Sequence, residues 1–204
     1  ASIAVQVKRT AKDGRVRVKY GTVAGPLILQ ANSKIEFDAS TYVAGQNAAL
    51  VFESVTFLAG GSLLDYVAVT DPEENFLSLS DDGRTILIND PAIPFEAVWV
   101  GGGDVNRVND PRNWVCRNRD GEILSEMVPS IHTRIHVTGT TTFNVPEGQS
   151  LVCRKLTFGV CTLGADCDWR GLGVVDLTNA TIDMDGHRLD LTGFKGNGIL
   201  GSVV

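Results

Sequence analysis

The sequence predicts an all-β protein, and it favours a parallel β-helix, or β-solenoid, over β-sandwich domains. Nearly every apolar run alternates with polar residues at period two, which is typical of short strands. Glycine-containing turn signals separate these runs at short intervals, and no stretch has the periodicity of a helix longer than two turns.

The expected strands follow one another along the whole chain. Each alternating run ends near a turn signal such as Asp13-Gly14 or Asp185-Gly186, where glycine supplies the positive φ that tight turns require. Strands are expected at residues 2–8, 14–21, 34–38, 76–80, 84–90, 134–137, 174–178, 181–186 and 187–191.

A weak internal echo favours the solenoid. Segments 27–40, 57–69 and 144–158 share one pattern, in which an apolar residue precedes a small or polar turn, a serine and an alternating run. The first two segments lie about thirty residues apart, a spacing that suits one coil of a β-solenoid. Similar short strands and turns also occur in β-sandwiches, which are the alternative.

Two prolines in segment 88–98, Pro91 and Pro94, mark the best boundary between two units. We expect residues 1–93 to form a β unit with a basic N-terminal hairpin. Residues 94–204 are expected to form a second β unit, which contains all the cysteines.

The N-terminal hairpin carries a basic patch, formed by Arg15, Arg17 and Lys19 on its outward side. We interpret these charges as protection of an edge strand against pairing with other chains. Binding of anionic glycans or lipid head groups, or docking against the acidic part of a neighbouring copy, are the alternatives.

The charge balance argues against nucleic acid as a partner. The chain has 18 Lys and Arg against 24 Asp and Glu, a formal net charge of -6, whereas nucleic-acid binding depends on neutralising phosphates. No apolar run approaches the roughly 20 residues needed to cross a bilayer. We therefore expect no nucleic-acid partner and no transmembrane segment.

The four cysteines, Cys116, Cys153, Cys161 and Cys167, all lie in the second half of the chain. None forms a C-x-x-C pair, so their spacing argues against a zinc knuckle. An even number of cysteines clustered in one segment predicts two disulfides and an oxidising compartment, with the pairing left open. Free buried thiols are the first alternative and a metal site is the second.

Segment 97–116, AVWVGGGDVNRVNDPRNWVC, raises the question of a phosphate-binding loop. No Lys-Ser or Lys-Thr pair follows the three glycines, and the Asn-Asp-Pro run after them breaks the helix that a dinucleotide-binding motif needs. We interpret the glycines as a turn that Trp99 and Trp114 close over. The alternative is a sugar-binding site, in which an exposed Trp114 stacks on the sugar beside Arg112 and Asn113.

Two acidic residues near the C-terminus, Asp183 and Asp185, are candidate metal ligands. In an alternating strand they share the outward face while Ile182 and Met184 point inward, so a solvated face followed by a turn explains them. Calcium binding is the first alternative, and a carboxylate pair for catalysis is the second.

The histidines give little support for a catalytic nucleophile. No G-x-S-x-G motif is present, which disfavours a serine hydrolase. His132, Arg134 and His136 alternate with apolar residues in segment 131–137, so we interpret them as the outer face of a strand.

The combination of AVWVGGGDVNRVNDPRNW, VPSIHTRIHVTGTTTFNVPEGQSLVCRKLTF and LGADCDWRGLGVVDLTNATIDMDGHRLDL resembles the repeat regions of secreted bacterial surface proteins. In autotransporter-like passenger domains and adhesins of this kind, a Trp-x-Gly-x-Gly-Asp…Asn-Trp segment precedes right-handed parallel β-helix coils. Segment 57–89 resembles the closing coils of such a passenger. The resemblance implies a role in binding and scaffolding, and it implies no catalytic residues.

We therefore expect a non-catalytic, adhesin-like protein that is secreted or displayed on a bacterial cell surface. Its expected partner is a glycan or a host or cell-surface protein, and no cofactor is expected beyond calcium as the alternative at the acidic pair. A carbohydrate-binding module or a polysaccharide-degrading β-helix enzyme is the first alternative function. A self-assembling subunit of a surface lattice or filament is the second.

Overall fold

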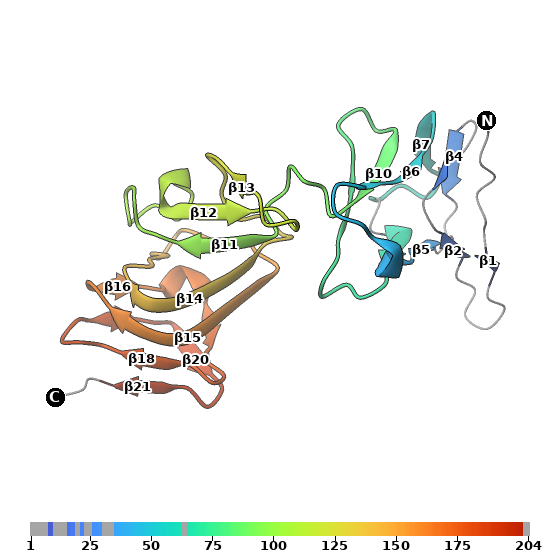
Figure 1. The fold of residues 1–204 in the computed structure, drawn as a ribbon. Helices are drawn as coiled ribbons and strands as arrows, with labels where there is room; N and C mark the ends of the chain where they lie inside the picture. Colours follow the sequence, from blue (N-terminus) through green and yellow to red (C-terminus); the bar gives the residue numbers. More distant parts are fainter. Residues whose placement is uncertain are drawn as a thin grey trace. The chain divides into compact units, whose positions relative to one another are not determined.

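The structure is a computed structural model that describes residues 8–9, 16–18, 21–22, 26–29, 35–62 and 65–201. The chain forms two compact units, Ala1–Pro91 and Ala92–Val204, and each unit is described by itself (Figure 1).

The fold is all-β, with parallel coils stacked into a β-solenoid of about 3 turns. The predicted fold class is therefore confirmed in its solenoid form, because neighbouring coils pair through parallel strands rather than through the antiparallel Greek-key sheets of a sandwich. The helical residues that the structure describes lie in short 3-10 turns, which include η1 (Ala39–Thr41), η3 (Pro111–Asn113) and η4 (Arg170–Leu172).

The strands of unit 1 are short, as the alternating runs predict. In chain order they are β1 (Lys8–Arg9), β2 (Val16–Val18), β3 (Gly21–Thr22), β4 (Pro26–Leu29), β5 (Ile35–Phe37), β6 (Ala48–Val51), β7 (Ser54–Phe57), β8 (Val67–Val69), β9 (Leu77–Leu79) and β10 (Thr85–Ile88).

Two coils stack in parallel in unit 1. Strands β2, β3 and β4 pair in order with β5, β6 and β7, and β8 then pairs with β5. The first two segments of the internal echo contribute strands to neighbouring coils, because Leu29 pairs with Phe57 and Ile35 pairs with Val67.

Antiparallel strands complete the sheet of unit 1 that contains β3 and β6. Strand β10 pairs antiparallel with β6 and with β9, so β9 and β10 form a hairpin rather than a further coil. This corrects part of the interpretation of segment 57–89 as closing coils. The turn at Asp82-Gly83 reverses the chain in a tight turn, in which Asp82 accepts a hydrogen bond from the Arg84 N–H at 3.0 Å.

Unit 2 contains a 7-stranded sheet. Its strands in chain order are β11 (Glu96–Trp99), β12 (Trp114–Arg117), β13 (Ile123–Leu124), β14 (Arg134–Thr141), β15 (Lys155–Leu163), β16 (Cys167–Asp168), β17 (Val174–Asp176), β18 (Thr181–Asp183), β19 (Leu189–Asp190), β20 (Gly193–Lys195) and β21 (Ile199–Gly201).

The coils of unit 2 follow from the pairing of these strands. Strands β11, β14, β15, β18 and β21 are parallel neighbours in the main sheet, and Figure 1 shows the last four stacked one after another. Strand β16 pairs with β19 and β17 with β20, again in parallel, which forms the other sides of the coils. Antiparallel strands β12 and β13 extend the main sheet beyond β11.

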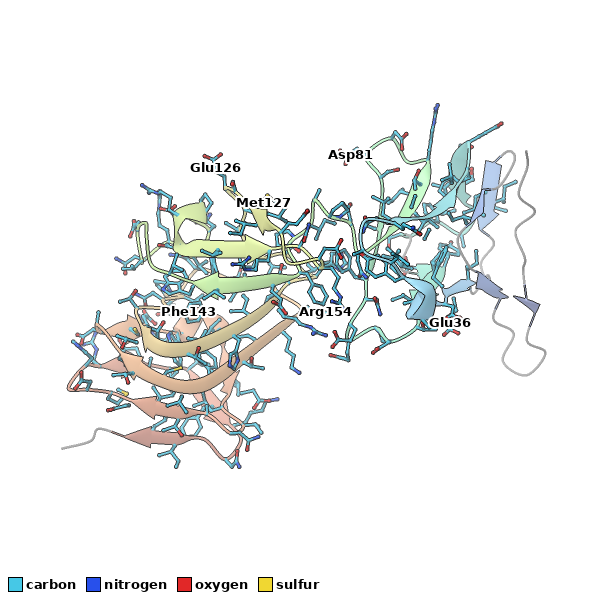
Figure 2. All side chains as sticks on the ribbon, in the orientation of Figure 1. Glu36, Asp81, Glu126, Met127, Phe143 and Arg154 are labelled. Carbon is cyan, nitrogen blue, oxygen red and sulfur yellow. The ribbon has the colours of Figure 1, made fainter. Side chains whose placement is uncertain are left out.

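An aromatic cluster fills the core of unit 2. The ring of Phe143, which is labelled in Figure 2, lies 5.2 Å from the ring of Trp99 and 6.1 Å from that of Trp169. Phe158 stacks on Trp169 at 4.5 Å with an interplanar angle of 28°. The indole N–H of Trp169 donates to the carbonyl of Phe143 at 2.8 Å, so this fully buried side chain keeps its polar atom paired.

Candidate functional site

The three glycines after β11 form a tight turn, as the sequence predicts. Gly101 has a φ of +62°, and a Cβ atom on Gly102 would lie 2.7 Å from the carbonyl oxygen of Arg112. The buried amide of Asn113 accepts a hydrogen bond from the Gly103 N–H at 2.8 Å and donates to the carbonyl of Asp104 at 2.7 Å. The Asn113 amide therefore ties both ends of the loop together, and the side chains of Asp104 and Gln149 accept further hydrogen bonds from the loop backbone.

The two tryptophans beside this turn are buried rather than exposed. Trp114 is 6% exposed, its ring meets that of Trp99 edge to face at 5.0 Å, and its indole N–H donates to the carbonyl of Val108 at 2.7 Å. Trp114 thus has no open face on which a sugar ring could stack, and the amide of Asn113 is committed to the loop. Of the three candidate sugar-binding residues, only Arg112 is exposed.

The exposed Arg112 is held by Asp110. Its Nε and Nη2 donate to Oδ1 and Oδ2 of Asp110 at 3.0 and 2.6 Å, and the carboxylate also accepts from the Asp104 N–H. The Arg112 hydrogen bonds, followed by that backbone N–H, hold the pKa of Asp110 well below its usual range. The pair fixes the start of η3, where Asp110 is the N-cap.

A second Asp-x-Arg pair, which sequence analysis missed, repeats this arrangement in the solenoid. Nε and Nη2 of Arg170 donate to Asp168 at 3.0 and 2.7 Å, beside η4. These hydrogen bonds lower the pKa of the Asp168 carboxyl, and Arg170 also lies 3.0 Å from Glu147. The sequence contains the pattern Asp-x-Arg at both 110–112 and 168–170, and this repeat could have indicated the second pair.

The acidic pair near the C-terminus has the predicted orientation. Ile182 is buried and Met184 packs against the core, while Asp183 and Asp185 lie on the outer side. A carboxylate oxygen of Asp183 accepts a hydrogen bond from the Asp185 N–H at 3.0 Å, and Asp185 has a left-handed φ of +44° in the turn. In the part of the chain that the structure describes, no group of three or more His, Cys, Asp or Glu side chains could hold a metal ion.

The prediction of two disulfides is wrong for this structure, because Cys116, Cys153, Cys161 and Cys167 are all free thiols. Three of the thiols point at backbone carbonyls instead, with Cys161 Sγ 3.0 Å from the Val137 oxygen. Burial raises the pKa of all four thiols, to about 11 for Cys116 and Cys167. The cysteines act as small core side chains, so they give no support for an oxidising compartment.

The basic patch falls largely outside the described residues. Arg15 and Lys19 are not among them, and of Arg17 only the backbone is described, paired with Lys8 in β1 and with Glu36 in β5.

The outer face of the main sheet in unit 2 is the clearest candidate binding surface. Its side chains alternate with buried ones, so that His136 is exposed between buried Ile135 and Val137, as predicted. We define this outer face by the exposed side chains of the parallel strands, namely Glu96, Val98, His136, Thr138, Thr140, Lys155, Val160 and Ile199.

Strand register places these residues in rows across the coils. Thr140 lies beside Thr162, and Val160 lies beside Thr181, which in turn lies beside Ile199. The imidazole Nδ1 of His136 lies 2.7 Å from the hydroxyl of Thr157 on β15, which orders the ring across two strands. Hydroxyl, methyl and imidazole groups thus repeat at the strand spacing of about 4.8 Å.

No described helix has the length and apolar character needed to span a membrane. Comparison of the chain with protein-family models, with curated proteins and with solved structures gives no match.

Proposed function

We propose that the chain is a non-catalytic, adhesin-like protein in which the β-solenoid acts as a rigid scaffold and the outer face binds a surface partner. The observation that carries the proposal is the exposure of large apolar side chains on a regular sheet. Val160 on β15, which has a parallel neighbour on each side, is 70% exposed, and Ile199 on β21, the last strand of the sheet, is 64% exposed. Exposed apolar groups gathered on one face indicate an interaction surface.

Glu96 and Lys155 lie at one end of the outer face, and the uncharged side chains of the rest of the face favour an extended, weakly charged partner. Threonine hydroxyls donate and accept hydrogen bonds, and the neighbouring methyl and isopropyl groups provide apolar contact. A glycan chain or an extended segment of a cell-surface protein offers the matching combination of hydroxyl or amide groups with apolar patches. The polar side chains of the loops at 101–113 and 168–170 support the scaffold instead, because they bind their own backbone.

A location outside the cell is part of the proposal, and it rests on the resemblance to bacterial surface proteins. Because the cysteines are free thiols, no disulfide gives further support to a location outside the cell. Protease treatment of intact producing cells tests the location, since a displayed chain is digested whereas a chain inside the cell is protected.

Self-assembly is the second candidate function, and the last coil of the described residues favours it. Val175 points into the core and is 3% exposed, whereas its register partner Phe194 in the next coil is 52% exposed. A large apolar ring that is exposed in this way favours contact with another molecule, and light scattering at low and high salt would detect the resulting assemblies.

The binding proposal is tested by applying the folded chain to an array of glycans and to immobilised cell-surface and matrix proteins. We expect saturable binding to a small set of related ligands, lost when the chain is heat-denatured. Equal signals from native and denatured chain, or no signal on the array or the proteins, would contradict the proposal.

A further inference from the structure

A cavity of about 300 Å³, open to solvent on one side, lies in unit 2, away from the outer face. It is bounded by segment 150–153, by the start of β15 and by β17. This volume is at the lower end of the range for small-molecule sites. The cavity is independent of the surface on which the proposed function rests.

About half of the surface that lines the cavity is apolar. Leu151, Leu156 and Leu172 line it and stay only half buried, whereas Phe158 and Val175, which also line it, are buried. Half-buried leucines around a cavity have apolar surface that a bound alkyl group would cover, and covering it is favourable.

The structure around the cavity is rigid. Phe158 is stacked on Trp169, and the Gly171 N–H donates to the carbonyl of Val145 at 2.9 Å. A Cβ atom on Gly171 would lie 2.5 Å from the carbonyl oxygens of Pro146 and Gln149, so the backbone is closely packed at this wall. A site with such support is preformed and loses little freedom when it binds.

One edge of the cavity is polar, where Asp176 on β17 and Lys195 on β20 lie side by side. The Lys195 Nζ is 3.4 Å from Oδ2 of Asp176, and Oδ1 of the same carboxylate accepts from the Thr178 N–H and hydroxyl at 3.0 and 2.7 Å. The Thr178 hydrogen bonds, aided by Lys195, lower the pKa of Asp176, which keeps the carboxylate charged.

This edge therefore has more unused donors than unused acceptors. Both oxygens of Asp176 already face donors, whereas the ammonium of Lys195 has three N–H groups and one carboxylate neighbour. An anionic group that contacts Lys195 gains a charge-assisted hydrogen bond. A cationic group at the same place would be repelled by the ammonium.

We propose that this cavity binds a small amphipathic carboxylate, with its alkyl chain against the leucines and its carboxylate on Lys195. The Cys153 thiol also lines the cavity, and its half-buried position makes it a reporter of occupancy. A bound alkyl chain would cover the thiol and slow its alkylation.

The test uses the full chain and three probes with carbon chains of equal length, namely octanoate, 1-octanol and octylamine. Titration calorimetry measures the binding of each probe. We expect octanoate to bind at one site and about tenfold more tightly than octylamine, since only the carboxylate gains the hydrogen bond to Lys195. Lys195→Met keeps the apolar stem and removes the ammonium, so it should bind octanoate no better than 1-octanol. Lys155→Met, an exposed lysine of β15, is the matched control and should bind as the wild type does.

Alkylation of Cys153 by N-ethylmaleimide gives a second reading in the unaltered chain. Octanoate should slow it in proportion to occupancy. Absence of saturable octanoate binding, octylamine binding as tight as octanoate binding, or an unchanged alkylation rate would each overturn the proposal.

Discussion

The guanidinium of Arg170 contacts both carboxylate oxygens of Asp168, with Nε 3.0 Å from Oδ1 and Nη2 2.7 Å from Oδ2. Arg112 and Asp110 make the same two contacts at 3.0 and 2.6 Å. Each aspartate also accepts a hydrogen bond from the N–H of its arginine, so each pair closes a turn beside a 3-10 helix. A repeated local arrangement thus helps to fix two loops of unit 2, together with long-range contacts from Gln149 and Glu147.

The first prediction concerns the pH dependence of stability. Since hydrogen bonds from Arg170 lower the pKa of Asp168 from its ordinary value of 3.8, the pair stabilises the fold fully above about pH 4. This contribution is lost as the pH falls through the lower pKa of the folded state. Arg170→Gln should be less stable than the wild type at pH 7, and the difference should shrink as the pH falls below 3.8.

Urea unfolding of both proteins between pH 7 and pH 2.5 measures that difference. Arg107→Gln, which changes an exposed arginine in the glycine loop, is the control and should follow the wild type. If the free energy of unfolding of Arg170→Gln stays below that of the wild type by the same amount down to pH 2.5, the interaction with the charged Asp168 carboxylate is not the source of the stability that Arg170 provides.

The second prediction concerns the aromatic core. Phe143 is fully buried between Trp99, Trp114 and Trp169, so Phe143→Ala leaves a cavity and should lower the unfolding free energy by about 3–5 kcal/mol. Phe194→Ala makes the same change at an exposed position and should cost under about 1 kcal/mol. Similar losses for the two variants in chemical denaturation would show that the core of unit 2 lies elsewhere.

The third prediction concerns the glycine turn. A methyl group on Gly102 would meet the Arg112 carbonyl oxygen at 2.7 Å, so Gly102→Ala should destabilise the chain by more than about 1 kcal/mol. Gly193→Ala places its methyl group at a normal distance of 3.9 Å from Val174, and it should change stability by less than about 0.5 kcal/mol. Thermal unfolding of the two variants compares them, and equal stability would contradict the close packing of the loop.

The fourth prediction concerns the cysteines. The intact chain, purified without reductant, should have the mass of a protein with free thiols, and N-ethylmaleimide should modify Cys153 before the three buried thiols. The buried thiols should react only after denaturation. A mass lower by two hydrogens per disulfide would instead restore the disulfides and the oxidising compartment that they imply.

Sequence alternation predicted several of the strands and the faces of their residues, whereas strands such as β6, β12, β20 and β21 lie outside the predicted ranges. It assigned Ile182 to the core and Asp183 to the outer side, and the internal echo at 27–40 and 57–69 matched segments that pair in neighbouring coils. An alternating pattern indicates which residues face the core, because a strand inside a coil has one buried and one exposed face.

Other features depend on contacts that no local pattern contains. Alternation is the same in parallel and antiparallel strands, so it could not distinguish the antiparallel β9–β10 hairpin from a further coil. An even number of cysteines fits disulfides and buried thiols equally well until their positions are known. The exposure of Trp114 was likewise undecided, because Phe143, which covers its ring, lies about thirty residues away in the sequence.

The measurement that tests the binding proposal most directly compares the outer face with an unrelated surface. Thr138→Arg places a long cation in the middle of the face, and Ala44→Arg makes an equal charge change in an exposed turn of unit 1. With the ligand identified on the array, biolayer interferometry should show binding weakened at least about tenfold by Thr138→Arg and unchanged by Ala44→Arg. Equal affinity of the two folded variants would show that the partner binds elsewhere and would contradict the proposed role of the outer face.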